Sequence, residues 1–506
     1  MERALLDEMV CPYCNGYFRV AREVETADGR LNYALIECRC FKFPIVEGIL
    51  LLSLAKGYGG AEEELQPYVP LQVAAIELLE RGDVQTLRAW IRRHIPLAAD
   101  IMSGSAGSYV QFCSKMAGQM ESARTSYLIR QGRYESVGFP RRTRFNALTE
   151  GAPKARPELG RYLAHVEAAR QLYRFCRMRL RPAQYGLEQL ANFYAWRFFA
   201  PRTNALAMQL QSLPMEGRVL SLCCGQGVFE NLITARAPSC NIISVDGQFL
   251  NLLATKRYVN PTGAYICHDL QMPLPFRDGY FDAVFSSTCL PEIPTQRSFV
   301  TESIRVTRDI GWTLFDSIWG VRIEQRIDRF RDYRFAQNIF LQLSEYSRLF
   351  SECTPAGRDV TVSIPAAPDA YMKAPGWISG KDRIEAAIQQ SADPMLSMLI
   401  IAPDRIPDAQ SIIRPPWLAP EKLCVSPVFS VKQTSRRELV LESRPWLAHP
   451  PPQHAPLAFE GYPATEVLKI DDLKDPEFLL QAFCRGLLAL LPREFGDEPR
   501  RLSAFL

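Results

Sequence analysis

The stretch Gly217-Arg-Val-Leu-Ser-Leu-Cys-Cys-Gly-Gln-Gly-Val-Phe-Glu-Asn-Leu-Ile233, followed by Asn241-Ile-Ile-Ser-Val-Asp-Gly247, decides the fold of this 506-residue chain. An apolar strand runs into a turn that carries Gly225 and Gly227, then a helical segment, then a second apolar strand that ends on Asp246. Glycines let the backbone approach a ligand, and an acid after the second strand accepts hydrogen bonds from ribose hydroxyls. We therefore predict a nucleotide-binding βαβ unit.

The residues downstream narrow the kind of site. Residues 268–294 read His-Asp-Leu-Gln-Met-Pro-Leu-Pro-Phe-Arg-Asp-Gly-Tyr-Phe-Asp-Ala-Val-Phe-Ser-Ser-Thr-Cys-Leu-Pro-Glu-Ile-Pro, and Glu302-Ser-Ile-Arg-Val306 follows. Together with the glycine turn, this series resembles the class I S-adenosylmethionine (SAM) methyltransferases, in order and in register, over roughly residues 200 to 320. The resemblance implies an α/β fold with a Rossmann-like seven-stranded sheet, and SAM as the methyl donor.

The resemblance also implies a set of SAM-binding residues. Gly225 and Gly227 would lie against the methionine part of SAM, Asp246 would hold the ribose, and Asp269 with Leu270 would frame the adenine. The whole expected set is Ser221, Cys223, Gly225, Gly227, Asp246, Gly247, Asp269, Leu270 and Ser286.

Two residues of this set depart from the family pattern. Ser221 stands where many relatives carry an acid that positions the SAM amino group, a loss of charge assistance of about 1 kcal/mol. Cys223 replaces the first glycine of the turn and adds a side chain where the backbone should approach the ligand. These departures keep open the alternative of a degenerate SAM-binding scaffold.

Candidate catalytic residues follow the fourth strand of the resemblance. Methyl transfer needs mainly alignment of the acceptor with the methyl group, and one base helps when the acceptor is a hydroxyl or a ring nitrogen. We expect Ser287 and Glu292 to serve there, although Glu292 could equally cap the next helix. The Asn-Pro-Pro-Tyr type of signature, typical of exocyclic amine methylation, is replaced by Phe285-Ser-Ser-Thr288.

A second motif lies at the N-terminus. Cys11-Pro-Tyr-Cys14 and Cys38-Arg-Cys40 could supply four thiolates to a tetrahedral zinc ion, and Phe41-Lys-Phe-Pro-Ile-Val-Glu-Gly-Ile49 follows. This pattern resembles the zinc ribbon of small methyltransferase activator proteins and that of large-subunit rRNA guanine methyltransferases. It implies a structural zinc site. The second pair is C-x-C where C-x-x-C is usual, so its geometry should be tighter.

We expect four regions in the chain. They are a zinc-ribbon-like domain (1–56), a mainly helical region (57–200), a SAM-dependent methyltransferase domain (201–403) and a small α+β, winged-helix-like C-terminal module (404–506). Residues 121–181 carry fourteen Lys and Arg against five Glu and no Asp. Such a basic segment could face RNA phosphates, or it could be a solvated helix face paired with acids elsewhere.

Composition sets outer limits. The net charge of +4, with both signs mixed, excludes a polycation, and no apolar run approaches the length of a membrane span. An acidic start without a signal-peptide pattern and fourteen scattered cysteines favour a cytoplasmic protein with free thiols. We expect a small-molecule acceptor, with RNA (rRNA or tRNA) as the alternative, no membrane partner, and an oligomeric state that the sequence leaves open.

Overall fold

The computed structural model describes residues 1–52, 68–116, 195–319 without 196 and 294, 341–363, 377–390, 395–406, 418–443 without 436, 463–496 without 493, and 501–505. The basic segment 121–181 and most of the helix that we expect over residues 321–350 lie outside these residues. Of that second segment, α15 (Leu343–Cys353) is described and begins only at Leu343.

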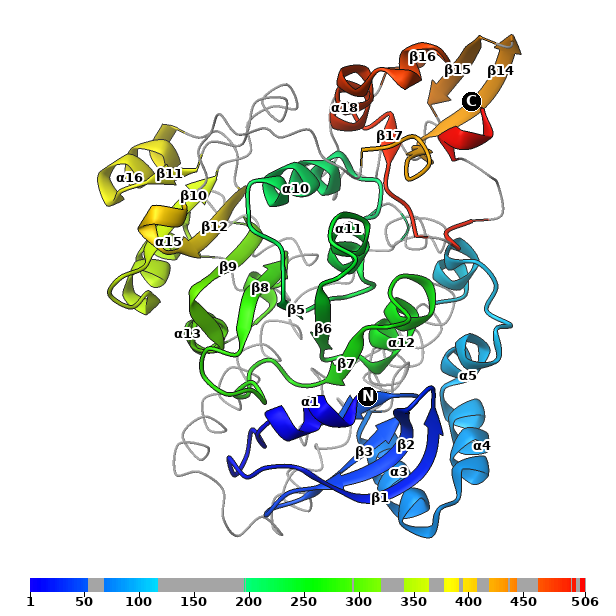
Figure 1. Cartoon of the computed structure of the whole chain (residues 1–506), viewed down its shortest axis with the longest axis vertical. Coiled ribbons are helices and arrows are strands. Elements are labelled where there is room, and N and C mark those ends of the chain that lie inside the picture. Colours follow the sequence, from blue (N-terminus) through cyan, green and yellow to red (C-terminus); the bar gives the residue numbers. More distant parts are fainter. Residues whose placement is uncertain are drawn as a thin grey trace, which may run out of the picture.

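The centre of the molecule is the predicted methyltransferase sheet (Figure 1). Five parallel strands lie in the order β7 (Ala264–Cys267), β6 (Asn241–Asp246), β5 (Arg218–Leu222), β8 (Phe281–Ser287) and β9 (Thr307–Trp319). The sheet continues with β12 (Met395–Ile401), antiparallel between β9 and β10 (Asp359–Ser363). The prediction of a Rossmann-like sheet is therefore confirmed, and the antiparallel strands β12 and β10 close it.

Helices cover both faces of this sheet and enclose two apolar clusters. On one face lie α10 (Pro201–Gln211), α11 (Val228–Arg236) and α12 (Phe249–Tyr258). On the other face lie α13 (Gln296–Arg305), α15 and α16 (Lys381–Gln390), the last of which follows the short edge strand β11 (Ile378–Ser379). This is the three-layer arrangement of an open α/β domain.

The seven predicted strands are β5 to β10 and β12, and the N-terminal strands with β11 extend this sheet to twelve strands among the described residues. After α1 (Arg3–Glu8), the strands β1 (Arg19–Ala27), β2 (Arg30–Glu37), β3 (Lys42–Val46) and β4 (Ile49–Leu51) form an antiparallel series. β4 pairs in parallel with β7, Leu50 lying opposite Ile266. The edge of the methyltransferase sheet is thereby covered within the same chain, which removes an exposed row of peptide groups. The hydrophobic pattern of a strand does not predict which other strand it pairs with, so the sequence alone does not predict the pairing of β4 with β7.

The helical region is described as α3 (Tyr68–Arg81), α4 (Val84–His94) and α5 (Pro96–Ser103). The predicted apolar positions Leu71, Leu79, Leu87 and Ile91 are buried. The Asp83 carboxylate accepts a hydrogen bond from the Thr86 amide at 2.9 Å and so begins α4. α5 packs against α12, which brings this region next to the methyltransferase domain.

The C-terminal module contains β14 (Phe429–Ser435), β15 (Glu438–Ser443) and β16 (Thr465–Lys469), with β13 (Cys424–Val425) paired to β17 (Leu488–Ala489). α18 (Pro476–Cys484) begins as predicted, with the Asp475 carboxylate accepting from the Glu477 amide at 3.0 Å. The sequence of residues 460–467 predicts a further helix in this module. This prediction is wrong from Thr465 onward, because β16 pairs with β15, which buries Leu468 completely. The single-turn helices are η1 (Leu290–Glu292), η4 (Pro403–Arg405), η6 (Asp472–Lys474) and η7 (Leu502–Ala504).

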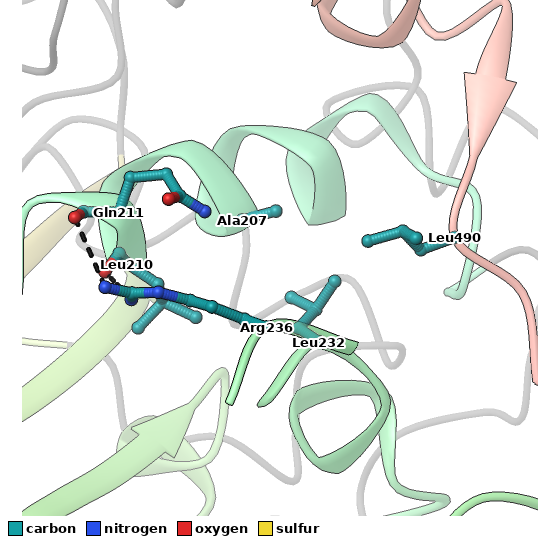
Figure 2. Close-up of a pocket in the computed structure, with 6 residues that line it drawn as sticks. All are labelled: Ala207, Leu210, Gln211, Leu232, Arg236 and Leu490. Atoms are coloured by element: carbon teal, nitrogen blue, oxygen red, sulfur yellow. Dashed lines mark hydrogen bonds between the residues drawn. The ribbon is translucent and has the colours of Figure 1, made fainter. Parts of the chain in front are cut away.

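α10 is tied to its neighbours by polar contacts. The Asn204 amide donates to the carbonyls of Phe483 and Leu488, which docks the C-terminal module on α10 (Figure 1). At the other end of α10 the Arg236 guanidinium donates to the carbonyls of Leu210, Gln211 and Leu213. Figure 2 shows Arg236 beside the small apolar pocket lined by Ala207, Leu210, Gln211, Leu232 and Leu490. This pocket contains no predicted site residue and belongs to the packing of α10 on α11.

No helix among the described segments combines the length and apolar character that crossing a membrane requires.

Candidate functional site

The glycine turn leaves room for a ligand above it. Cys223, Gly225 and Gly227 have positive φ angles of 53°, 54° and 85°. A Cβ on Gly227 would lie 2.6 Å from the Thr255 methyl group, so this position excludes a side chain. At Gly225 the one atom of the described residues that lies near a Cβ position is a guanidinium nitrogen of Arg197, 4.0 Å away. The turn therefore presents its backbone to open space at the end of β5.

Asp246 lies at the end of β6 and faces this turn. Its buried carboxylate accepts hydrogen bonds from the amides of Gly225 at 2.9 Å and Gln248 at 2.8 Å. Burial raises the pKa of Asp246 to about 6, against the lowering effect of these hydrogen bonds. The Asn251 side-chain amide also donates to this carboxylate, at a longer 3.4 Å. A carboxylate offers about four lone pairs, so capacity remains for hydroxyl donors. Gly247 follows directly, with the His268 carbonyl 3.8 Å from a Cβ built on it.

A buried acid lies beside Ser221. Glu230, in the first turn of α11, is fully buried and accepts a hydrogen bond from the Ser244 hydroxyl at 2.7 Å. Burial raises the pKa of Glu230 to about 7, and the hydroxyls of Ser244 and Ser221 act in the opposite direction. The sequence signal was a Glu between Phe229 and Leu232 on an apolar helix face.

The Glu302–Arg305 motif holds the connection between β7 and β8. The Glu302 carboxylate accepts from the Leu274 amide at 2.8 Å, and the Arg305 guanidinium donates to the Phe276 carbonyl at 2.8 Å. This connection begins with Asp269 and Leu270, next to the end of β7. Asp269 accepts from the Gln271 amide at 3.1 Å, and Leu270 is buried.

A carboxylate that the sequence analysis missed lies at the ends of β8 and β9. Asp316 is buried and accepts from the hydroxyls of Ser287 at 2.8 Å, Ser317 at 2.6 Å and Ser397 at 2.9 Å. The available signal was an acid within β9, directly after the sequence Trp312-Thr-Leu-Phe315. Ser286, one residue before Ser287, is also buried, and its hydroxyl has no hydrogen-bond partner among the described residues.

The backbone is strained at the same place. Thr288 and Ser317, which are not glycines, have φ angles of 59° and 57°. Backbone strain of this kind concentrates at functional sites. Glu292 lies in η1, and its expected role stays a prediction.

A disulfide connects two of these parts. Cys223 of the glycine turn is bonded to Cys289 of the loop after β8, with Cα atoms 6.1 Å apart. The expectation of free thiols is therefore wrong for this pair, because the fold brings together two cysteines that are 66 positions apart. The other eleven cysteines in the described part of the chain are free.

Four of those free thiols form the predicted metal-ligand cluster. The sulfurs of Cys11, Cys14, Cys38 and Cys40 lie within 4.8 Å of one another. Cys11 and Cys40 are 3.6 Å apart, and Cys14 and Cys38 are 3.7 Å apart. Tetrahedral zinc with 2.3 Å bonds separates its sulfurs by about 3.8 Å, so the donor set fits zinc despite the C-x-C spacing.

Residues from outside the methyltransferase domain close over the turn. The Arg197 guanidinium donates to the Thr288 hydroxyl at 2.9 Å. The Tyr109 hydroxyl donates to the Gln226 side chain, and its ring lies 5.7 Å from that of Phe495. The helical region and the C-terminal segment therefore meet at the glycine turn.

The pKa of Asp246 predicts a pH dependence. The resemblance assigns the ribose hydroxyls to Asp246, whose pKa is about 6 and whose ionised carboxylate accepts hydrogen bonds much more strongly than the protonated form. Affinity for SAM should therefore be constant above that pH and fall about tenfold per pH unit below it. Calorimetric titrations between pH 5 and 8 measure this. Glu230→Gln removes the other acid that titrates nearby and should leave the midpoint near 6; a flat wild-type profile would contradict the assignment.

One part of the chain matches a known protein family. Residues 220–315 match the methyltransferase domain family. No curated protein matches the chain. Similar solved structures include a SAM-dependent methyltransferase from Thermotoga maritima, described as a possible histamine N-methyltransferase (15% identity, 41% of this chain and 91% of that chain, TM-score 0.30).

Two further structures are similar over the same share of the chain. One is a methyltransferase in a complex with the Trm112 methyltransferase activator of Haloferax volcanii (17% identity, 40% and 90% covered, TM-score 0.30). The other is the plantazolicin methyltransferase BpumL with S-adenosylhomocysteine (16% identity, 41% and 84% covered, TM-score 0.31). From the domain match and the order of its strands, the chain contains a class I SAM-dependent methyltransferase core.

Proposed function

We propose that the protein transfers the methyl group of SAM to a small-molecule acceptor at the ends of β8 and β9. The observation that carries this proposal is a group of polar side chains there: the buried Ser286, whose hydroxyl has no partner among the described residues, and the half-buried Ser287, which is bonded to the buried Asp316. A buried hydroxyl without a partner costs free energy unless a ligand satisfies it. Their burial favours an enclosed acceptor over an extended one.

The residues around the glycine turn fit the donor. SAM supplies a methyl group already activated by its sulfonium, so the protein's task is to hold and align. The open space at Gly225 suits the methionine part, and the spare capacity of the Asp246 carboxylate suits the ribose hydroxyls. Asp269 and Leu270, at the neighbouring strand end, would frame the adenine.

Ser287 is the residue that we expect to contact the acceptor. Because its hydroxyl donates to Asp316, its oxygen lone pairs remain available to an acceptor N–H or O–H. Asp316 is itself held by Ser317 and Ser397, so it would act as a positioning residue.

The structure also supports zinc as a structural ion. The four-cysteine cluster leaves no protein ligand position open for chemistry, and a closed thiolate set is typical of structural sites. The ribbon would then stabilise the methyltransferase sheet through the β4–β7 pairing.

Methyl-labelled SAM, incubated with the protein and a cell extract, tests the acceptor class. We expect label in the low-mass fraction. Label that disappears on nuclease treatment would instead establish RNA, the alternative supported by the basic segment 121–181. No transferred label with intact SAM binding would favour the degenerate scaffold.

Ser287→Ala should reduce transfer by about 100-fold while SAM affinity stays unchanged, because proton-transfer assistance is typically of that size. Ser351→Ala, which removes a hydroxyl bonded to a carbonyl within α15, is the matched control. Wild-type transfer by Ser287→Ala would contradict the proposed role.

A further inference from the structure

Arg197 stands out as a cation held over the glycine turn by a segment outside the methyltransferase motifs. Its neighbours Phe198 and Phe199 are buried, with Phe198 packed against Tyr109 at 5.0 Å between ring centroids. The Thr203 hydroxyl donates to the Arg197 carbonyl at 2.5 Å. The rings and this bond hold the backbone at Arg197, and the bond to the Thr288 hydroxyl orients its guanidinium.

The guanidinium reaches across two strand ends. One nitrogen lies 4.0 Å from the Cβ position of Gly225, after β5, and another donates to Thr288, after β8. The charge of Arg197 also lowers the pKa of Asp246 at the end of β6. No carboxylate in the described part of the chain lies within ion-pair distance of Arg197. Of its five N–H donors, one is bonded to Thr288, and no other residue in the described ranges accepts from the rest.

The groups around Arg197 define which part of a ligand its guanidinium can bind. Asp246 already matches the ribose end of the donor, so the opposite, methionine end would lie toward Gly225 and Arg197. That end carries one anionic group, the carboxylate, together with two cationic groups that Arg197 would repel. The N-terminus of α11, at Gly227, adds a favourable dipole for an anion at the same place.

We propose that Arg197 binds the carboxylate of the methionine part of SAM through its free N–H donors, held in position by Thr288. This assignment rests on the proposed function and identifies a residue for the methionine end of the site. A planar guanidinium suits this task because it can donate two parallel hydrogen bonds to a carboxylate.

Calorimetric titration of the full chain with two probes tests the assignment. S-adenosylhomocysteine carries the carboxylate, whereas 5′-methylthioadenosine lacks the whole amino-acid part. Arg197→Gln should weaken binding of the first by about 30-fold and change binding of the second by less than about twofold, because only the first offers a charged partner. Arg197→Lys, which keeps the charge but loses the fork, should give an intermediate loss.

Two further variants keep the result interpretable. Thr288→Ala removes the bond that orients the guanidinium and should weaken only S-adenosylhomocysteine, by a few-fold. Arg218→Gln is the control. Arg218 lies at the start of β5, at the opposite end of this strand from the glycine turn, and its guanidinium stacks on the Tyr280 ring. It should change neither affinity.

The outcomes separate this inference from the proposed function. Equal losses for both probes in Arg197→Gln, or no loss for either, would overturn the role of Arg197 while SAM binding stands. Unchanged affinity for S-adenosylhomocysteine with a raised KM for the acceptor would assign Arg197 to the acceptor instead. If the wild type binds neither probe, the proposed function fails, and this inference fails with it.

Discussion

Replacing Asp246 with alanine is expected to weaken SAM binding by about 100-fold or more, equivalent to about 2.8 kcal/mol. The carboxylate would lose its hydrogen bonds from the ribose hydroxyls. It would also release the Gly225 amide, which it holds at 2.9 Å, so the turn itself would be less well ordered. Isothermal titration at pH 7.5 measures the loss directly.

Asp282→Ala is the matched control for this variant. Asp282 lies near the start of β8, at the opposite end of the parallel strands from Asp246. Its carboxylate also accepts a backbone hydrogen bond, from the Arg218 amide at 2.8 Å. Its replacement should cost some stability and leave SAM affinity unchanged. Affinity retained in Asp246→Ala, or lost equally in both variants, would show that Asp246 does not bind the ribose.

Replacing Cys11 with serine is expected to abolish zinc binding and unfold the N-terminal domain. Zinc in small thiolate sites supplies about 10–16 kcal/mol of folding free energy. Because β4 is hydrogen-bonded to β7 and shares a buried core with the sheet, the loss should reach the methyltransferase domain. We expect the thermal midpoint to fall by about 10 °C or more, and plasma emission spectroscopy to find about one zinc per wild-type chain.

Cys240→Ser controls for loss of a thiol. Cys240 is free, half-buried and outside the cluster, in the loop before β6. Its replacement should leave both zinc content and the thermal midpoint unchanged. A wild-type protein without zinc, or a Cys11→Ser variant as stable as the wild type, would contradict a metal-dependent ribbon.

Local sequence patterns predicted the parts of the site that lie close together in the chain. The turn from β5 into α11, and Asp246 at the end of β6, follow from hydrophobic runs and glycine spacing within about thirty residues. The hydrogen bond between Gly225 and Asp246 is the direct consequence of two parallel strands ending at one edge. The Glu302–Arg305 motif could be recognised because its residues also lie close together in the sequence.

The parts that sequence reasoning missed depend on contacts between distant segments. Arg197 lies at the turn because its neighbour Phe198 packs against Tyr109, and the hydrophobic periodicity around Arg197 cannot predict a contact with so distant a residue. The Cys223–Cys289 bond likewise needs the β5–β8 pairing. At Thr465–Lys469, strand pairing with β15 overrode a weak helical pattern.

Titration of the wild-type chain with SAM tests the central claim most directly, with the Cys223–Cys289 bond intact and again after its reduction by a dithiol. We predict one SAM per chain, with a dissociation constant of about 1 μM, equivalent to about −8.2 kcal/mol. No binding in either redox state at SAM concentrations up to about 1 mM would contradict a SAM-dependent methyltransferase.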